Sequence, residues 1–142
     1  RDLHLSLRRQ RQMCIRDRNY GWPRVTHGEE YGGGKIGKLT QEGFKDPKWI
    51  WVPSIAPSGM AFYNGKMFPE LKDHLLIGSL KFKQIHAIKI LNGHPVLERK
   101  LLKKSYGRIR DLEVMNDGSI LFITDEDKSG RYKGGLYKIF KK

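Results

Sequence analysis

The chain has 142 residues, and its 28 Lys and Arg against 15 Asp and Glu give a formal net charge of +13. This length suits one modest domain, and so basic a chain raises the question of a nucleic-acid or anionic-surface partner. Outside the first 18 residues the basic side chains are scattered, with no Lys/Arg run longer than two and no aromatic-interleaved basic motif. We therefore expect no specific nucleic-acid partner.

Membrane and disulfide signals are absent from the sequence. Cys14 is the only cysteine, so no intrachain disulfide or Cys-based zinc site can form among these residues. No apolar run reaches the length of a membrane span, and no signal-peptide core precedes the chain. We predict no membrane span, and the chain itself carries no export signal.

Residues 1–18 form a basic leader that differs from everything after it. This segment contains six Arg and no Lys, whereas the rest of the chain is rich in Lys. We predict that the leader is not native to the fold and derives from a cloning leader or a misread upstream frame. The alternative is a disordered basic tail.

Residues 19–48 read as an ordered, loop-rich segment. Glycines are frequent and no helical periodicity is present, and Tyr20, Trp22 and Tyr31 could anchor the segment on a core. The glycines at 32–34 lack the lysine and hydroxyl spacing of a phosphate-binding loop, which favours a flexible turn. The following stretch, residues 49–63, combines aromatic side chains with prolines and predicts a rigid, non-helical segment.

Three turn dipeptides divide the remainder of the chain. Asn64-Gly65, Asn92-Gly93 and Asp117-Gly118 each lie between apolar runs, and such pairs supply the φ > 0 residues of tight hairpin turns. We therefore predict antiparallel hairpins at all three positions.

The apolar runs themselves predict an all-β fold. The runs 74–80 and 119–124 are apolar at both alternating sets of positions, so both faces of their sheets should be covered. Their spacing favours propeller blades, and a last blade of three strands normally needs a strand from elsewhere to close the ring. The expected strands are 60–63, 75–80, 85–91 and 96–102 in the first set and 108–114, 119–125 and 134–140 in the second.

Arg108 and Arg110 stand two residues apart at the start of the second set. On a strand they share one face at about 7 Å and can converge on one planar anion through bidentate hydrogen bonds. Together with Lys81 they would suit a ligand with several carboxylates. The alternative, favoured by spacing alone, is a pair of exposed cations.

Metal-ligand and nucleophile patterns are weak. The five histidines show no pairing at metal-ligand spacing. Asp125 opens a stretch that imitates the start of a calcium loop, but Leu136 stands where the bidentate Glu belongs, which favours a polar hairpin. We predict neither a metal site nor a catalytic residue within these 142 residues.

The sequence contains five motifs in a fixed order: NYGWP (19–23), WVPSIAPSGMAFYNG (51–65), FPELKDHLLIGSLK (68–81), RIRDL (108–112) and NDGSILFITDE (116–126). In order and spacing they closely resemble the C-terminal part of the soluble glucose/sorbosone dehydrogenase family. The resemblance covers residues 19–142. It implies part of a six-bladed β-propeller, about two blades of four-stranded antiparallel sheet, in proteins that use pyrroloquinoline quinone (PQQ) and calcium to oxidise aldose sugars.

The resemblance also implies roles for individual residues. Lys81 matches a lysine that contacts the cofactor. Arg108 and Arg110 match two arginines that hold the cofactor's carboxylates, so the resemblance favours an anion site over the pair of exposed cations that spacing alone favours. Ser54 resembles a small hydroxyl residue beside the cofactor. Trp51 resembles an aromatic residue at the sugar entrance, and for both Ser54 and Trp51 the alternative is packing of the loop.

The departures from the family are as informative as the matches. In the family an acidic Gly-Pro motif that helps to bind calcium lies shortly before NYGWP, and a histidine base lies further upstream. The basic leader 1–18 stands there instead. We therefore expect a C-terminal fragment that holds about two blades and half a cofactor site, with its calcium ligands upstream, and that does not turn over sugar alone.

For the whole protein the resemblance implies that a histidine base removes the hydroxyl proton at C1 of an aldose while a hydride passes to the quinone. It also implies an external electron acceptor and a periplasmic or secreted location. The competing interpretation is a noncatalytic propeller module that binds a protein or glycan through its loops, because a fold alone does not confer activity.

Overall fold

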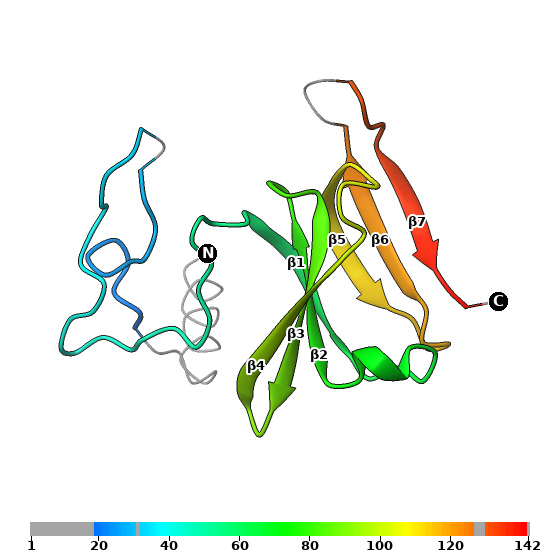
Figure 1. Cartoon of the computed structure of the whole chain (residues 1–142), viewed down its shortest axis with the longest axis horizontal. Helices are drawn as coiled ribbons and strands as arrows, with labels where there is room; N and C mark the ends of the chain where they lie inside the picture. The colour runs from blue at the N-terminus through cyan, green and yellow to red at the C-terminus, as the bar shows by residue number, and fades with distance from the viewer. Residues whose placement is uncertain (1–18, 31, 127–129, 142) are drawn as a thin grey trace, which may run out of the picture. The chain divides into compact units, whose positions relative to one another are not determined.

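The computed structural model describes residues 19–30, 32–126 and 130–141, and these belong to two compact units, residues 1–52 and 53–142 (Figure 1). The predicted leader 1–18 lies outside the described residues. Within the described part, no helix has the length and apolar character needed to cross a membrane.

The second unit consists of two antiparallel sheets (Figure 1). The four strands of the first sheet follow one another in sequence order, and a three-residue 3-10 helix, η1, lies between the first two. The second sheet has three strands, also in sequence order. This arrangement confirms the all-β prediction and the division into four strands and then three. The elements are β1 (Pro57–Tyr63), η1 (Pro69–Leu71), β2 (His74–Ser79), β3 (Gln84–Leu91), β4 (His94–Leu101), β5 (Arg108–Val114), β6 (Ile120–Asp125) and β7 (Gly135–Ile139).

Two of the three predicted hairpin turns are confirmed. Asn92 and Gly93 have φ values of 50° and 73° and form the two-residue turn between β3 and β4. Gly118 has a φ of 82°, and its N–H donates to the carbonyl of Met115 at 2.9 Å in the turn between β5 and β6. Glycine adopts this left-handed conformation without steric cost, which explains its place in both turns.

The prediction of a tight hairpin at Asn64-Gly65 is wrong. The connection between β1 and β2 runs from residue 64 to residue 73 and contains η1, and neither Asn64 nor Gly65 is among the positive-φ residues. Gly65 is needed for another reason. A Cβ at this position would lie 2.7 Å from the Cα of Gly118, so the glycine permits the β1–β2 connection to touch the β5–β6 turn.

The apolar core lies between the two sheets. Ile109 and Phe122 from the second sheet pack in one buried cluster with Leu76 and Ile85 from the first. The prediction that both faces are covered holds for β2, of which five residues are buried and one is half-buried. It is wrong for β6, where Ile123 remains 43% exposed on the outer face. The buried members of the cluster are Tyr63, Phe68, Leu71, Leu76, Ile85, Ala87, Ile109, Leu112, Ile120 and Phe122.

The first unit is a loop structure with two isolated bridges, Val25↔Lys38 and Glu29↔Lys35. The predicted glycine turn is present, since the N–H of Gly33 donates to the carbonyl of Glu30 at 2.9 Å. The prediction that Tyr20 and Trp22 anchor the segment on a core is wrong, because they are 50% and 70% exposed. Their hydrophobic rings suggested burial, but the buried side chain here is that of Val25. Tyr31 lies outside the described residues.

Candidate cofactor site

One end of the paired sheets gathers most of the predicted site residues. We call it the cationic end and define it by Ser54, Lys81, Arg108, Arg110 and Asp125. Strand register brings its parts together, because β1 and β2 pair through Pro57↔Ser79 and β5 and β6 pair through Arg108↔Asp125.

A direct contact joins the two sheets at this end. The hydroxyl of Ser58, near the start of β1, donates to the carbonyl of Ile109 in β5 at 2.7 Å. A Cβ at Gly78, near the end of β2, would lie 2.9 Å from Cγ2 of Ile109, so β2 also approaches β5 closely. Ile109 stands between the two arginines in sequence, and Lys81 follows Gly78 by three residues. The three predicted cations therefore come from neighbouring segments.

The backbone of Lys81 is fixed by a buried serine. The hydroxyl of Ser79 donates to the carbonyl of Ile55 at 2.7 Å and accepts from the N–H of Phe82 at 3.0 Å. The N–H of Lys81 donates to the same Ile55 carbonyl at 3.2 Å. Ser79 is fully buried, so these bonds are shielded from water, whereas the Lys81 side chain is exposed. The sequence does not single out Ser79, because its acceptor Ile55 lies 24 residues earlier in the chain.

Arg108 and Arg110 both contact a carboxylate of the protein itself, that of Asp125. Nε and Nη2 of Arg110 lie 2.7 Å and 2.5 Å from Oδ2 of Asp125. Nη1 of Arg108 lies 3.7 Å from the same oxygen. Both guanidinium groups thus stand beside one anionic oxygen, and both remain partly exposed.

A β-bulge in β5 contributes to this geometry. Ile109 pairs with Thr124 and Asp111 pairs with Ile123, so Arg110 is an extra residue without a partner in β6. The bulge places Arg110 and Asp111 side by side on the exposed side of the strand between the buried Ile109 and Leu112. A regular strand would alternate sides at each residue, so the sequence spacing alone did not predict this bend.

Asp125 is the site residue that sequence reasoning missed. In the sequence it stands only as the first residue of a calcium-like loop, part of which lies outside the described residues. Regular pairing extended from the Asp117-Gly118 turn would place Asp125 opposite Ile109, and the bulge at Arg110 moves it opposite Arg108, so local pairing alone did not identify it. Within the described part of the chain, no group of three or more His, Cys, Asp and Glu could hold a metal ion.

Ser54 and Trp51 occupy different units. Oγ of Ser54 accepts from the N–H of Ala56 at 3.2 Å. The carbonyl of Ile55, between these two residues, accepts from the N–H of Lys81, so Ser54 lies next to the turn at Lys81, which we call the Lys81 turn. Trp51 belongs to the first unit, where its ring packs edge-on against Trp49 with the ring centroids 6.5 Å apart. Ser54 therefore lies beside the Lys81 turn, and the described ring contact of Trp51 is with Trp49 in the first unit.

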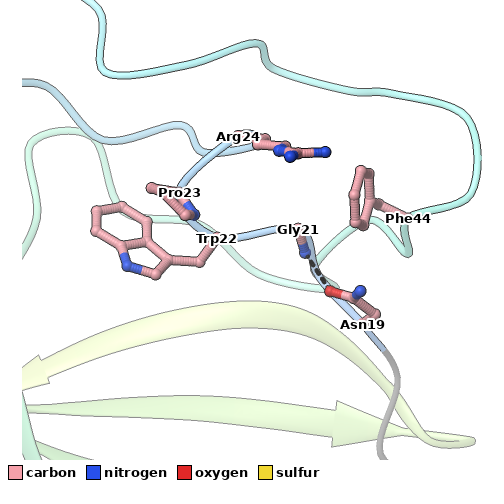
Figure 2. A pocket seen from close by; sticks show the side chains of 6 residues that line it. All are labelled: Asn19, Gly21, Trp22, Pro23, Arg24 and Phe44. Carbon is pink, nitrogen blue, oxygen red and sulfur yellow. Dashed lines mark hydrogen bonds between the residues drawn. The ribbon is translucent and has the colours of Figure 1, made fainter.

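The first unit has a small open pocket of about 230 Å³, which Figure 2 shows with Trp22 and Phe44 on opposite sides. The N–H of Gly21 donates to Oδ1 of Asn19 at 2.9 Å beneath it. Gly21 is required here because its φ is +83° and a Cβ would lie 2.8 Å from the Phe44 ring. The sequence analysis did not predict this pocket. Its lining residues are Asn19, Gly21, Trp22, Pro23, Arg24 and Phe44.

Comparison with known proteins matches this fold to part of the propeller structures of the glucose dehydrogenase class. The chain superposes on a glucose dehydrogenase crystal structure with a TM-score of 0.78 and 32% identity, covering 88% of this chain and 36% of that one. It superposes on the apo-form of the soluble aldose sugar dehydrogenase from Escherichia coli with a TM-score of 0.74 and 36% identity, over 85% of this chain and 34% of that one.

Sequence comparison leads to the same class. The chain is 41% identical over 113 residues to aldose sugar dehydrogenase YliI of Escherichia coli K12, which is 77% of this chain and 30% of that protein. The glucose/sorbosone dehydrogenase family model matches residues 12–137. The chain therefore belongs to the glucose/sorbosone dehydrogenase family, and it spans about a third of the length of these relatives.

Proposed function

We propose that this chain supplies part of the cofactor site of a quinoprotein oxidoreductase that oxidises the C1 hydroxyl of aldose sugars with PQQ. Two neighbours support the proposal. The Escherichia coli relative is named an aldose sugar dehydrogenase. A PQQ-bound aldose sugar dehydrogenase from Streptomyces coelicolor shares the fold, with a TM-score of 0.59 at 22% identity over 85% of this chain.

The observation that carries the proposal is the gathering of three cations at one end of the sheets. Two guanidinium groups stand beside one oxygen of Asp125, and the Lys81 turn lies next to the start of β1. Three cations against the carboxylates of Asp125 and of Asp111, which stands beside Arg110 in the bulge, still leave an excess of positive charge, and this fits a ligand with several carboxylates. The donor set therefore fits PQQ, which has three.

In this proposal each residue has a distinct task. Arg108 and Arg110 bind carboxylates of the cofactor and orient its ring, because guanidinium groups donate in a fixed planar fork. Lys81 donates to a cofactor oxygen and stabilises negative charge there. Ser54 donates a hydroxyl hydrogen bond to the same ligand. PQQ, when bound, accepts the hydride of the sugar.

The remaining parts of the proposal concern the whole protein. Trp51 contacts the sugar at the entrance, where an aromatic face packs well against sugar C–H groups. Calcium is bound by residues other than those described here, and an external acceptor reoxidises the cofactor. We also place the whole protein in the periplasm or outside the cell, as implied by its family, and we treat residues 19–142 as one part of the propeller domain.

The proposal is tested by titrating PQQ into the purified chain in a calorimeter. Replacing both arginines, R108A/R110A, removes two charge-assisted anchors, and we expect PQQ binding to weaken at least about 100-fold. The charge-matched control is K66A/K72A, which removes two exposed lysines at the opposite end of the sheets. Equal affinities for the two double variants would contradict the proposal.

A further inference from the structure

Asp125 has a position that the proposed cofactor contacts do not explain. Its Oδ2 atom is the common partner of Arg108 and Arg110, with the shortest contact to Nη2 of Arg110 at 2.5 Å. The side chain is 28% exposed, and within the described residues its buried Oδ1 atom has no hydrogen-bond partner. The Oδ2 atom of this carboxylate thus contacts two cations, whereas its Oδ1 atom is buried in the protein.

The surrounding backbone holds this carboxylate in place. Asp125 is the last residue of β6 and pairs directly with Arg108. A Cβ at Gly107 would lie 2.6 Å from the carbonyl oxygen of Asp125, so β5 and β6 are in close contact at this point. The carboxylate is therefore attached to a rigid strand end, whereas the two arginines reach it through long side chains.

Two like charges on neighbouring residues repel each other and would spread apart without a counter-charge. Asp125 offsets this repulsion, and its two contacts with Arg110 restrict the plane of that guanidinium group. The other N–H groups of both arginines are then presented in a limited set of directions. A ligand that fits these directions binds without the cost of ordering the side chains.

We propose that Asp125 is a positioning residue that orients Arg108 and Arg110 for a rigid, planar polycarboxylate. This inference rests on the proposed function. Asp125 does not touch the ligand in this role, and it acts through the two arginines. Its negative charge weakens the general attraction for anions, so what it provides is discrimination between anions of different shape.

These two effects of Asp125 can be separated by measurement. In D125N the carboxylate charge is lost, so attraction to any polyanion increases. The amide cannot hold both cations, so the orientation of the guanidinium groups is lost as well. A flexible tricarboxylate such as citrate should bind D125N as well as or better than it binds the wild type, while rigid PQQ should lose its advantage.

The experiment is calorimetric titration of PQQ and of citrate into the full chain. We expect the ratio of the citrate Kd to the PQQ Kd to fall about tenfold in D125N, as for one lost charge-assisted hydrogen bond. D117N is the matched control, because Asp117 also pairs with a cation, Lys138, in the same sheet at 2.9 Å. The ratio should be unchanged in D117N.

A second variant keeps the test valid if D125N does not fold. D125E retains the negative charge but carries it one methylene farther from the backbone, so it cannot hold the two guanidinium groups in the same positions, and the same fall in the ratio is expected. An unchanged ratio in a folded D125N or in D125E overturns the positioning role. Failure of the proposed function looks different: PQQ then binds wild type and R108A/R110A equally or binds neither of them.

Discussion

The two ends of the sheet pair are built from the same strands but with different chemistry. At the cationic end, charged and partly exposed side chains converge on Asp125. At the other end, the hydroxyl of Tyr63 donates to the carbonyl of Gly118 at 2.7 Å and accepts from the N–H of Phe68 at 2.9 Å. We call this second region the tyrosine end, defined by Tyr63, Phe68 and Gly118.

The difference separates stability from binding. Tyr63 is fully buried, so its neutral hydrogen bonds contribute to folding and offer nothing to a ligand. The arginines of the cationic end are accessible, and exposed ion pairs contribute little to stability. Substitutions at the tyrosine end should therefore change the free energy of unfolding, and substitutions of the arginines should change ligand binding.

The largest expected loss of stability comes from Y63F. This change leaves the Gly118 carbonyl and the Phe68 N–H without their buried partner, which should cost about 3 kcal/mol in the free energy of unfolding. Urea denaturation measures it. Y132F is the control, since the Tyr132 hydroxyl donates to the Lys104 carbonyl in an exposed position and its loss should cost under about 1 kcal/mol. PQQ affinity should be unchanged in a folded Y63F protein, and a change there would break the separation of the two ends.

A smaller loss of stability is expected from S79A. This variant sharpens the comparison of the two ends, because Ser79 is a buried residue beneath the cationic end. The variant removes the hydroxyl that binds Ile55 and Phe82, which should cost about 2 kcal/mol. The Lys81 turn should loosen with it, so PQQ binding should also weaken a few-fold. S105A is the matched control, because the exposed Ser105 hydroxyl makes only a 3.4 Å contact with Lys103. Equal denaturation midpoints for S79A and S105A would refute this role.

The smallest effect concerns Asp117, in the β5–β6 turn of the tyrosine end. Hydrogen bonds from the Ser119 side chain, Lys138 and the Ser119 backbone lower the pKa of Asp117 well below its ordinary value of 3.8. A lowered folded-state pKa contributes stability that is present above pH 3.8 and is lost as the pH falls below it. The wild type should therefore be slightly more stable than D117N at neutral pH, and the gap between their urea midpoints should close in acid. A gap that widens in acid would contradict the lowered pKa of Asp117.

Local features of the fold could be predicted from the sequence, and long-range ones could not. The strands were predictable because short apolar runs and turn dipeptides such as Asn92-Gly93 are signals that act over a few residues. Asn64-Gly65 has the same local signal but a different structure, because the close approach to Gly118 decides its conformation. Tertiary contact outweighed the turn preference at that position.

The candidate site shows the same limit. The spacing of Arg108 and Arg110 alone favoured a pair of exposed cations and the family resemblance favoured an anion site, whereas in the structure both side chains contact Asp125. Recognition of Asp125 itself required the β5–β6 register and the bulge at Arg110, which depend on packing across the sheet. The role of Ser79 was likewise hidden, because its acceptor Ile55 is 24 residues away in sequence.

The central claim is that the cationic end holds an anionic quinone cofactor, and an NMR titration tests it most directly. We predict that adding PQQ to the ¹⁵N-labelled chain shifts the backbone amides of Ile55, Lys81, Arg108, Arg110 and Asp125 first. The amides of Phe68 and Gly118 at the tyrosine end should remain unchanged. Shifts centred on the tyrosine end or on the Trp22 pocket, or no shifts at any residue, would contradict the claim.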